Sequence, residues 1–306
     1  PRTPQESVVI EAFSKVLQVE DISIFDDFFM LGGHSLSVLS LASYLKRQNW
    51  VVTAEQIYQN ATPSALASII KPHSSIVVED TQEVEETFPL LANHHWLLNR
   101  YNVNHCNSSA LIDFEVSIEG EYLNQSIAQI LKHHDGMRRV LISDESGERQ
   151  QKVQPFSKLA PWWFTEDLSN VDEEALPQAL AEACQGYQVS LHIEECLFKA
   201  VLFDLGRERG QRLLLVMHRL LIDPYCYMFF MDDLYQGYES ARQGKPITLP
   251  EKTLSVAEWS RWQYEYAQGK AKDYFPYWKN LSWEKCLPLS EDPNLSLPEE
   301  VPEVLA

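Results

Sequence analysis

One serine lies in a local sequence that suits covalent attachment of a prosthetic group. Ser35 follows two glycines and a histidine in the string Asp-Asp-Phe-Phe-Met-Leu-Gly-Gly-His-Ser-Leu, residues 26–36. The glycines permit a tight turn, and Ser35 is predicted to begin a helix, where free backbone N–H groups favour a phosphate ester on its hydroxyl. The alternative for a glycine-glycine-x-serine string is that the serine only caps the helix.

A second string places a histidine, an arginine and an aspartate at the end of a predicted strand. His218-Arg219-Leu220-Leu221-Ile222-Asp223-Pro224 ends an apolar run that is predicted to be a strand. Histidine is the side chain best suited to move a proton at neutral pH, whereas the guanidinium of Arg219 stays protonated and offers only donors. A buried ion pair between Arg219 and Asp223 is the reading we favour for this pair over direct ligand contact.

Two further histidine pairs are weaker candidates. His133-His134-Asp135-Gly136 lies at a predicted helix end, and packing and capping contacts are favoured there over catalysis. The same interpretation applies to His94-His95, beside Trp96 on a predicted amphipathic stretch. The cysteines are widely spaced and odd in number, which predicts neither a disulfide framework nor a zinc site; they are Cys106, Cys184, Cys196, Cys226 and Cys286.

The elements that must position Ser35 are helical. A helix is predicted after Pro4 with an apolar stripe from Val9 to Leu17, then a loop over 20–34, and a helix from Ser35 to Arg47. Short helices over Thr53–Tyr58 and Thr62–Ile70 complete a bundle of about seventy residues. Residues 71–87 carry five acids and one lysine, and they are predicted to form an interdomain linker.

After the linker the pattern becomes mixed α and β. Alternation over 110–119 predicts a half-buried strand, 123–134 a helix, 197–205 a strand, and 212–218 a strand covered on both faces. Two helices should follow, with stripes that we expect to pack in the core in preference to lining a groove. These stripes are Tyr227, Met231, Leu234 and Tyr238 on one helix, and Trp259, Trp262 and Tyr266 on the other.

Residues 26–36, with the helix pattern of the first seventy residues, resemble the peptidyl carrier domain of nonribosomal peptide synthetases. The resemblance implies that Ser35 carries a 4′-phosphopantetheine arm, flanked by Gly32, Gly33, His34 and Leu36, whose thiol holds an aminoacyl or peptidyl thioester. A phosphopantetheinyl transferase would install the arm from coenzyme A. Asp26 and Asp27 would help that enzyme recognise the domain, or are simply solvated loop acids.

The second unit resembles the condensation superfamily of the same synthetases, and within it the epimerization branch. The matching strings open at Pro89-Leu90-Leu91, 104–112, 133–138 and Leu249. The resemblance implies a chloramphenicol-acetyltransferase-like α/β lobe and a motif His-His-x-x-x-Asp-Gly. Here Arg219 replaces the second, working histidine, and Pro224 replaces glycine, which puts close approach of a pantetheine arm in doubt. His218 and Asp223 would keep structural roles.

The chain is therefore predicted to comprise a carrier domain over 1–70, a linker over 71–87 and a condensation-like first lobe over 88–306, α followed by α/β. Catalytic relatives have two lobes, and 219 residues suffice for one. The favoured function is a carrier joined to a non-catalytic docking platform for a tailoring enzyme such as an oxygenase. The alternatives are an active epimerization or condensation module with His218 as base, and a purely structural linker protein, which the complete carrier string disfavours.

Composition sets the remaining expectations. The 306 residues carry 25 Lys and Arg against 44 Asp and Glu, a formal charge of -19, which argues against a nucleic-acid partner. No apolar run has the length of a membrane helix, no signal peptide is evident at the start, and a reducing cytoplasm is expected. The loaded amino acid is not encoded here, because an adenylation domain would select it.

Overall fold

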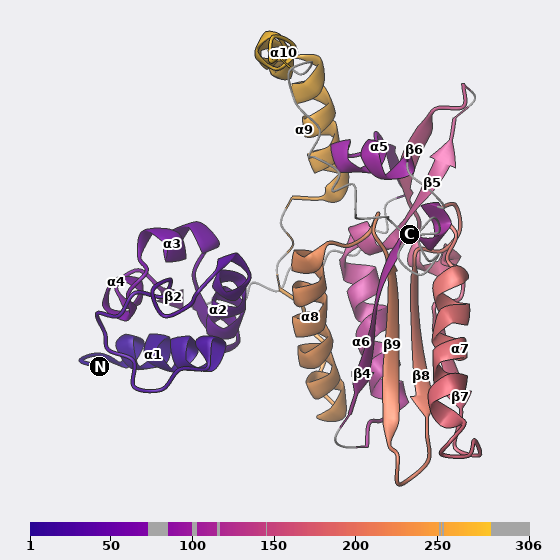
Figure 1. Ribbon diagram of the computed structural model, residues 1–306, viewed down its shortest axis with the longest axis horizontal. Coiled ribbons are helices and arrows are strands. Elements are labelled where there is room, and N and C mark those ends of the chain that lie inside the picture. The colour runs from indigo at the N-terminus through magenta and orange to yellow at the C-terminus, as the bar shows by residue number, and fades with distance from the viewer. Residues whose placement is uncertain are drawn as a thin grey trace, which may run out of the picture. The chain divides into compact units, whose positions relative to one another are not determined.

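The computed structural model describes residues 1–72, 85–99, 103–114, 117–144, 146–250, 252 and 254–282. The chain divides into two compact units (Figure 1). The first comprises Pro1–Asp80 and Ile222–Glu251, and the second comprises Thr81–Leu221 and Lys252–Ala306.

The amino-terminal part of the first unit is a small helical bundle. Its helices are α1 (Pro4–Leu17), α2 (Ser35–Arg47), α3 (Ala54–Gln59) and α4 (Pro63–Ala67). Each start has a chemical cause: Thr3, Thr53 and Thr62 accept a backbone N–H at the starts of α1, α3 and α4, and prolines occupy the first turns of α1 and α4. Fully buried apolar side chains fill the interior, among them Val9, Phe13, Phe28, Leu41 and Ile57. The predicted four helices are confirmed.

The last helix of this bundle is shorter than predicted. We expected it to reach Ile70, but α4 ends at Ala67. Lys71–Pro72 forms a short strand, β2, paired antiparallel with β1 (Trp50–Val51), and this pairing requires extended backbone just after Ile70. The first unit also contains α8 (Pro224–Arg242).

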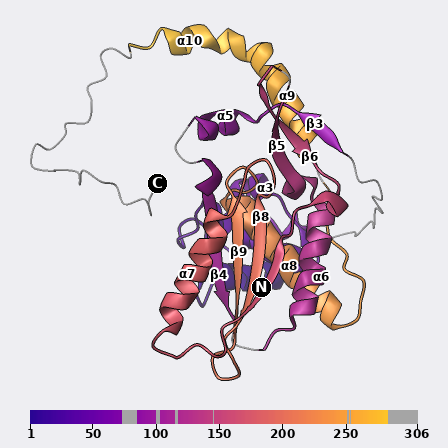
Figure 2. The ribbon, with the colours of Figure 1, turned by 90° about the vertical axis from the view of Figure 1, so that its right-hand side faces the viewer.

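A four-stranded sheet forms the centre of the second unit. Its order is β4-β9-β8-β7, with β4 (Asn107–Asp113), β9 (Gln211–His218), β8 (Phe198–Asp204) and β7 (Trp163–Asp167). β9 pairs antiparallel with β4 and β8, whereas β7 and β8 are parallel. Helices α6 (Gly120–His133) and α7 (Leu176–Val189) lie on opposite faces (Figure 2).

The two faces of this sheet use alternate side chains. Val201 and Leu214 pack with Leu180 of α7, whereas Leu202, on the other face of β8, lies against Gly120 at the start of α6. Every residue of β9 from Leu213 to His218 is buried. The prediction of an apolar strand covered on both faces is confirmed, because a strand between two helical layers has no solvent side.

The first strand of this sheet is shorter than the alternating pattern predicts. We expected it to continue to Ile118, but β4 ends at Asp113, opposite Arg212. The partner strand begins at Gln211, whose carbonyl accepts the N–H of Phe114 at 3.4 Å, and the pairing ends there because the chain turns at Gly210, which adopts φ +71°. The N–H of Ile118 donates instead to Gln211 Oε1 at 2.9 Å.

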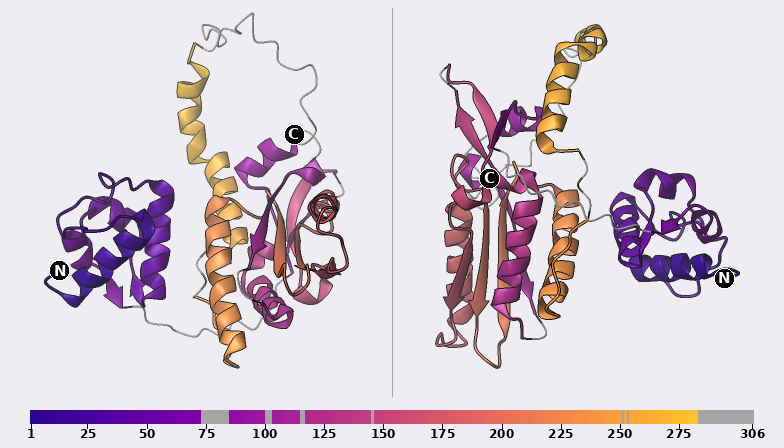
Figure 3. Two further views of the ribbon diagram at one scale, coloured as in Figure 1. Left: turned by 60° about the horizontal axis from the view of Figure 1, so that its bottom comes forward. Right: turned by 180° about the vertical axis from the view of Figure 1, so that it is seen from behind.

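A second, smaller sheet has the order β3-β6-β5, with β3 (Glu86–Phe88), β6 (Arg149–Val153) and β5 (Arg139–Ser143). Helix α9 (Val256–Gln268) packs against β3, and α5 (Ala92–Leu98) follows β3 along the chain. Helix α10 (Phe275–Lys279) comes after α9, and Figure 3 shows α9 and α10 extending away from the sheets. The predicted linker over 71–87 thus begins and ends in strands, because β2 and β3 find pairing partners; its residues 73–84 lie outside the described part.

The expectation that both aromatic stripes pack in the core is wrong for α9. Trp259, Trp262 and Tyr266 are 41%, 52% and 38% exposed. On α8 Leu234 is buried, while Tyr227 is only half-buried. Periodicity identifies one face of a helix, but it does not say whether that face has something to pack against.

Candidate functional site

The loop before Ser35 is held in place by its own acids and by an aromatic anchor. Asp27 Oδ1 accepts the backbone N–H of Phe29 and Met30, at 2.8 and 3.1 Å. The N–H of Phe28 donates to the carbonyl of Ala61 at 2.8 Å, and its fully buried ring meets Phe13 edge-on at 4.9 Å. The loop is therefore tied to two separate parts of the bundle.

Two glycines turn the chain from this loop into α2. Gly32 has φ +101°, a conformation that side chains other than glycine rarely adopt. A Cβ on Gly33 would lie 2.3 Å from Phe28 Cδ1 and 2.5 Å from the Phe28 carbonyl oxygen, which accepts the N–H of Gly33 at 2.8 Å. Glycine is required at 33 because the turn presses directly on the buried ring.

Ser35 is the first residue of α2 and is exposed. The N-cap residue of α2 is His34, which has an extended backbone. Ser37 Oγ accepts the N–H of His34 at 2.6 Å and donates to the His34 carbonyl at 2.8 Å. Among the hydrogen bonds of the described residues none involves Ser35 Oγ. The alternative in which Ser35 only caps the helix is therefore wrong, and its hydroxyl faces solvent.

The surroundings of Ser35 fit a phosphate ester. The first turn of a helix leaves backbone N–H groups unpaired and carries the positive end of the helix dipole, and both favour a phosphodiester on the first residue. Ser35 is exposed and its hydroxyl has no hydrogen bond within the described residues, so an ester can form without breaking a contact. The site can hold 4′-phosphopantetheine, which supplies a terminal thiol on a flexible arm.

The two acids considered for recognition both have local structural roles. Asp27 supports the loop as described above, and Asp26 Oδ2 accepts the backbone N–H of Ser23 at 2.8 Å. Neither is a freely solvated loop acid, because each makes backbone hydrogen bonds that shape the loop. Recognition of these acids by a transferase remains a prediction.

In the second unit His218 ends β9 and is fully buried. Its Nδ1 accepts the N–H of Leu220 at 3.1 Å, so the proton lies on Nε2, which donates to the Val103 carbonyl at 2.6 Å. Burial lowers the pKa of His218. Both ring nitrogens are engaged with the backbone, and neither has a lone pair free to accept a substrate proton.

Arg219 and Asp223 do not form the buried ion pair that we expected. Both residues are exposed, and each makes its hydrogen bond elsewhere. The N–H of Arg219 donates to the Cys106 carbonyl at 2.9 Å, and Asp223 Oδ1 accepts the N–H of Cys226 at 2.8 Å as the cap of α8. Pro224 occupies the first turn of that helix, where a missing N–H costs nothing.

Two side chains that the sequence did not single out hold the loop after His218. Arg139, 7% exposed, donates to Gly136 O at 2.8 Å, Gln151 Oε1 at 2.6 Å and Leu220 O at 2.8 Å. Gln151 is itself fixed by a bond to Pro89 O at 2.7 Å. A charged residue at the start of an apolar strand was the only signal for Arg139, because its partners come from distant segments.

His94 lies in the same buried region. It is 2% exposed, its Nδ1 has no hydrogen-bond partner, and burial together with the charge of Arg139 lowers its pKa to about 3. His95 is exposed. The prediction of a packing role for this pair holds for His94, which is a neutral core histidine.

The string His133-His134-Asp135-Gly136 also has the predicted packing role. The rings of His133 and His134 meet edge-on at 4.8 Å, and Asp135 Oδ1 accepts a hydrogen bond from Arg138 Nη2 at 2.8 Å. Arg138 is 2% exposed and also donates to the Gln154 carbonyl at 2.9 Å. These contacts join the end of α6 to the residue that follows β6.

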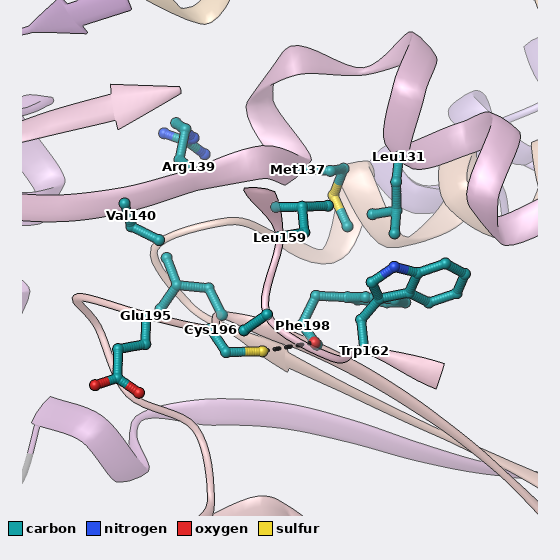
Figure 4. Close-up of a pocket in the computed structure, with 11 residues that line it drawn as sticks. Leu131, Met137, Arg139, Val140, Leu159, Trp162, Glu195, Cys196 and Phe198 are labelled. Atoms are coloured by element: carbon teal, nitrogen blue, oxygen red, sulfur yellow. Dashed lines mark hydrogen bonds between the residues drawn. The ribbon is translucent and has the colours of Figure 1, made fainter. Parts of the chain in front are cut away.

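A shallow, mainly apolar pocket lies between β5, the end of α6 and the start of β8 (Figure 4). Its one thiol, Cys196, donates to the Phe198 carbonyl at 3.1 Å, and burial raises the pKa of that thiol. A protonated thiol is a poor nucleophile. Cys196 is therefore a poor candidate for a covalent nucleophile.

The described residues contain neither a candidate metal site nor a candidate membrane helix. No group of three or more histidine, cysteine, aspartate or glutamate side chains in the described ranges could hold a metal ion. In that same part of the chain, no helix combines the length and apolar character needed to cross a membrane.

Two family models match the chain in succession. Residues 7–70 match the phosphopantetheine attachment site, and residues 89–304 match the condensation domain. Among curated proteins, tyrocidine synthase 1 from Brevibacillus parabrevis is 28% identical over 98% of this chain, and bacitracin synthase 3 from Bacillus licheniformis is 25% identical over 91%. The chain spans only 27% and 4% of those two proteins.

Solved structures share the fold of the second unit. The epimerization domain from the third module of tyrocidine synthetase B aligns with a TM-score of 0.61 at 24% identity, covering 67% of this chain and 47% of that one. The first condensation domain of the calcium-dependent antibiotic synthetase aligns with a TM-score of 0.54 at 16% identity, covering 68% and 50%. The predicted chloramphenicol-acetyltransferase-like α/β lobe is confirmed at the level of fold.

Proposed function

The chain belongs to the condensation-domain family and carries a phosphopantetheine attachment domain, and we propose that Ser35 is the attachment point and that the condensation domain does not catalyse. In this proposal the first domain holds an aminoacyl or peptidyl thioester. The second is a docking platform from which another enzyme acts on that tethered group. The observation that carries the proposal is the contrast between an exposed, unbonded Ser35 hydroxyl and a fully bonded, buried His218.

Attachment of the arm would proceed by displacement at phosphorus. Ser35 Oγ attacks the phosphate of coenzyme A that bears pantetheine, a new Oγ–P bond forms, and the P–O bond to the adenosine bisphosphate breaks. A separate transferase takes the hydroxyl proton. This chain contributes the exposed nucleophile and the positive end of α2, which stabilises the charge on the phosphodiester.

The absence of a general base in the motif supports a non-catalytic second domain. A base must have a free lone pair within reach of the proton it removes. Both His218 nitrogens are bonded to the backbone, and Arg219, at the working position, is a cation with donors only. An exposed guanidinium is, however, well suited to a carboxylate on a partner protein, which supports the docking role.

The partners belong to the same proposal. An adenylation domain would select and activate the amino acid, and a tailoring enzyme such as an oxygenase would modify it while tethered. We also propose a cytoplasmic location, because coenzyme A and a transferase must reach Ser35.

Intact-mass measurement tests the carrier half. The chain is incubated with coenzyme A and a phosphopantetheinyl transferase, and one phosphopantetheinyl group should add to it. The Ser35→Ala variant should gain nothing, whereas Ser40→Ala, on the next turn of α2, should load normally. Loading of the Ser35→Ala variant would place the attachment elsewhere, and no loading of the parent chain would reject the carrier assignment.

A separate measurement tests the platform half. Loaded protein is mixed with candidate tailoring oxygenases, and binding is measured by comigration for the parent and for an Arg219→Glu variant. We expect the charge reversal to weaken binding at least tenfold. Oxygenases that bind the carrier domain alone as well as the whole chain would reject the platform.

The competing function is an active epimerization or condensation module with His218 as base. It predicts uptake of solvent deuterium at the α-carbon of a loaded aminoacyl group, or peptide formation, when the remaining half of the fold is supplied. The geometry of His218 supports neither outcome, and either one would overturn the non-catalytic assignment.

A further inference from the structure

A row of buried hydrogen bonds, which we call the Arg139 network, starts on α9 and runs through Ser260, Pro89, Gln151 and Arg139. Ser260 is fully buried, and its Oγ donates to the Pro89 carbonyl at 2.5 Å. Gln151 of β6 donates from Nε2 to the same carbonyl at 2.7 Å, and its Oε1 accepts Nη1 of Arg139 on β5 at 2.6 Å. The network therefore joins α9, β6 and β5, which lie together at one end of the second unit (Figure 2).

The Arg139 network ends on the turn that follows β9. Nη2 of Arg139 donates to the carbonyls of Leu220 and Leu221, at 2.8 and 3.4 Å. The N–H of Leu221 closes this turn by donating to the His218 carbonyl at 2.8 Å, and the N–H of Leu220 donates to His218 Nδ1 at 3.1 Å. Leu220 is thus held twice, at its carbonyl by Arg139 and at its N–H by the imidazole.

The aim of Arg139 at this turn depends on Gln151. A guanidinium is a rigid planar fork, so two fixed N–H donors determine the direction of the third. Nε of Arg139 is fixed by the Gly136 carbonyl at 2.8 Å, and Nη1 is fixed by Gln151 Oε1. Together these two bonds direct Nη2 at the carbonyl of Leu220.

Burial makes the members of the network depend on one another. Gln151 is 1% exposed and lies on β6, the middle strand of its sheet, while Arg139 is 7% exposed and Leu220 is 3% exposed. Water has little access to replace a lost partner at such positions, and an unsatisfied buried donor or acceptor is costly. The loss of one bond should therefore shift the next member of the network.

We propose that Gln151 is a positioning residue that holds, through Arg139, the Leu220 peptide against His218 Nδ1. Through the Pro89 carbonyl it also ties this position to Ser260 on α9. The inference rests on the proposed non-catalytic function and deepens it, because the Arg139 network then keeps the lone pair of His218 Nδ1 bonded to the backbone.

NMR of the full chain labelled with 15N-histidine tests this positioning. The His218 ring is assigned with a His218→Gln variant, and the parent should show a proton fixed on Nε2 and an unprotonated Nδ1. In Gln151→Met, which keeps the length but not the hydrogen bonds, we expect ring shifts averaged between the two tautomers. Exchange of the Leu220 amide should be about tenfold faster, while that of Val201, in the core of β8, stays unchanged and shows that the sheet is folded. A parental His218 pattern in this variant would overturn the proposal.

Two matched variants separate positioning from general packing. Gln151→Glu keeps an acceptor for Arg139 but loses the donor to Pro89, so the His218 ring should keep its parental pattern. Gln150→Met, at the half-buried neighbour on the other face of β6, should also leave that pattern unchanged. Equal loss of the pattern in Gln151→Glu and Gln151→Met would show that the bond to Arg139 does not position the turn, and it would overturn the proposal.

The link to α9 has its own test. Ser260→Ala removes one of the two donors to the Pro89 carbonyl, and exchange of the Leu220 amide should rise by about twofold. An unchanged rate would overturn the part of the proposal that concerns α9. Failure of the proposed function has a different readout, because deuterium uptake at the α-carbon of a loaded substrate would reject the non-catalytic assignment, whereas the ring signals of His218 report the network directly.

Discussion

The segment at Ser35 and the segment at His218 both contain a recognisable motif, yet the structure treats their polar groups in opposite ways. Around Ser35, Asp27 and Ser37 satisfy the backbone, and this leaves the serine hydroxyl exposed and unbonded. At the end of β9 the histidine itself satisfies the backbone and is buried. A motif residue is available for chemistry only when other groups make the hydrogen bonds that the surrounding backbone requires.

Removing Arg139, the buried arginine that holds the loop after His218, should give the largest effect. Arg139→Met would leave four backbone or side-chain oxygens without their donor, and we expect the free energy of unfolding of the second unit to fall by about 4 kcal/mol. Thermal or urea unfolding measures the loss. Loading of Ser35 should stay at the parental level.

The matched control is Arg149→Met, an exposed arginine on β6, which should change stability by less than about 0.5 kcal/mol. A loss of Ser35 loading in the Arg139→Met variant would show that the two regions depend on each other, and it would break the comparison drawn above.

A substitution in the glycine turn should have the converse pattern. Gly33→Ala forces a Cβ against Phe28, and we expect a loss of about 3 kcal/mol in carrier stability and at least a tenfold lower loading rate. Gly32→Ala, which meets no atom but has φ +101°, should cost only about 1 kcal/mol. Intact-mass time courses with urea unfolding measure both effects, and equal costs would refute the contact with Phe28.

Acid should destabilise the second region through His94. The pKa of this histidine is about 3 when folded and has an ordinary value of 6.5, so between these values the unfolded chain binds the extra proton. The stabilisation is complete above pH 6.5 and is lost as the pH falls toward 3, at up to about 1.4 kcal/mol per pH unit. His94→Gln should remove that part of the slope in urea unfolding measured at several pH values.

The control for this titration is His95→Gln, since His95 is exposed. It should leave the pH dependence of stability unchanged. A slope in the His94→Gln variant equal to that of the parent would mean that His94 does not titrate in the folded protein as its burial implies.

The smallest effect is expected from restoring histidine at the second position of the His-His-x-x-x-Asp-Gly motif. Arg219→His places an imidazole at the working position, but Arg219 is exposed, so stability should change by less than about 0.5 kcal/mol. We also expect no deuterium uptake at the α-carbon of a loaded substrate, because His218 remains bonded to the backbone and Pro224 remains in the helix start. Mass spectrometry of the released amino acid measures this. Deuterium uptake by the Arg219→His variant would contradict this expectation and would show that a single substitution makes the second domain catalytic.

Much of the fold was predictable from local patterns. The start of α2 at Ser35 and the doubly covered β9 follow from turn residues and apolar runs. The end of β4 was not predictable, because it depends on where Gly210 turns the partner strand. Arg139 was missed for a similar reason, since its acceptors at Leu220 and Gln151 are distant in sequence.

The sequence by itself determined the identity of the carrier motif, the order of the elements and the presence of a cation at the working position, because each depends on residues close together in the chain. Tertiary structure decided which polar groups remain free. Nε2 of His218 is hydrogen-bonded because Val103, 115 residues away, presents a carbonyl to it. The rings on α9 are exposed because they lie on a different face of the helix from Ala257 and Ser260, which contact Phe88 and Pro89. Hydrogen-bond satisfaction and burial depend on segments brought together by folding, and local spacing does not encode them.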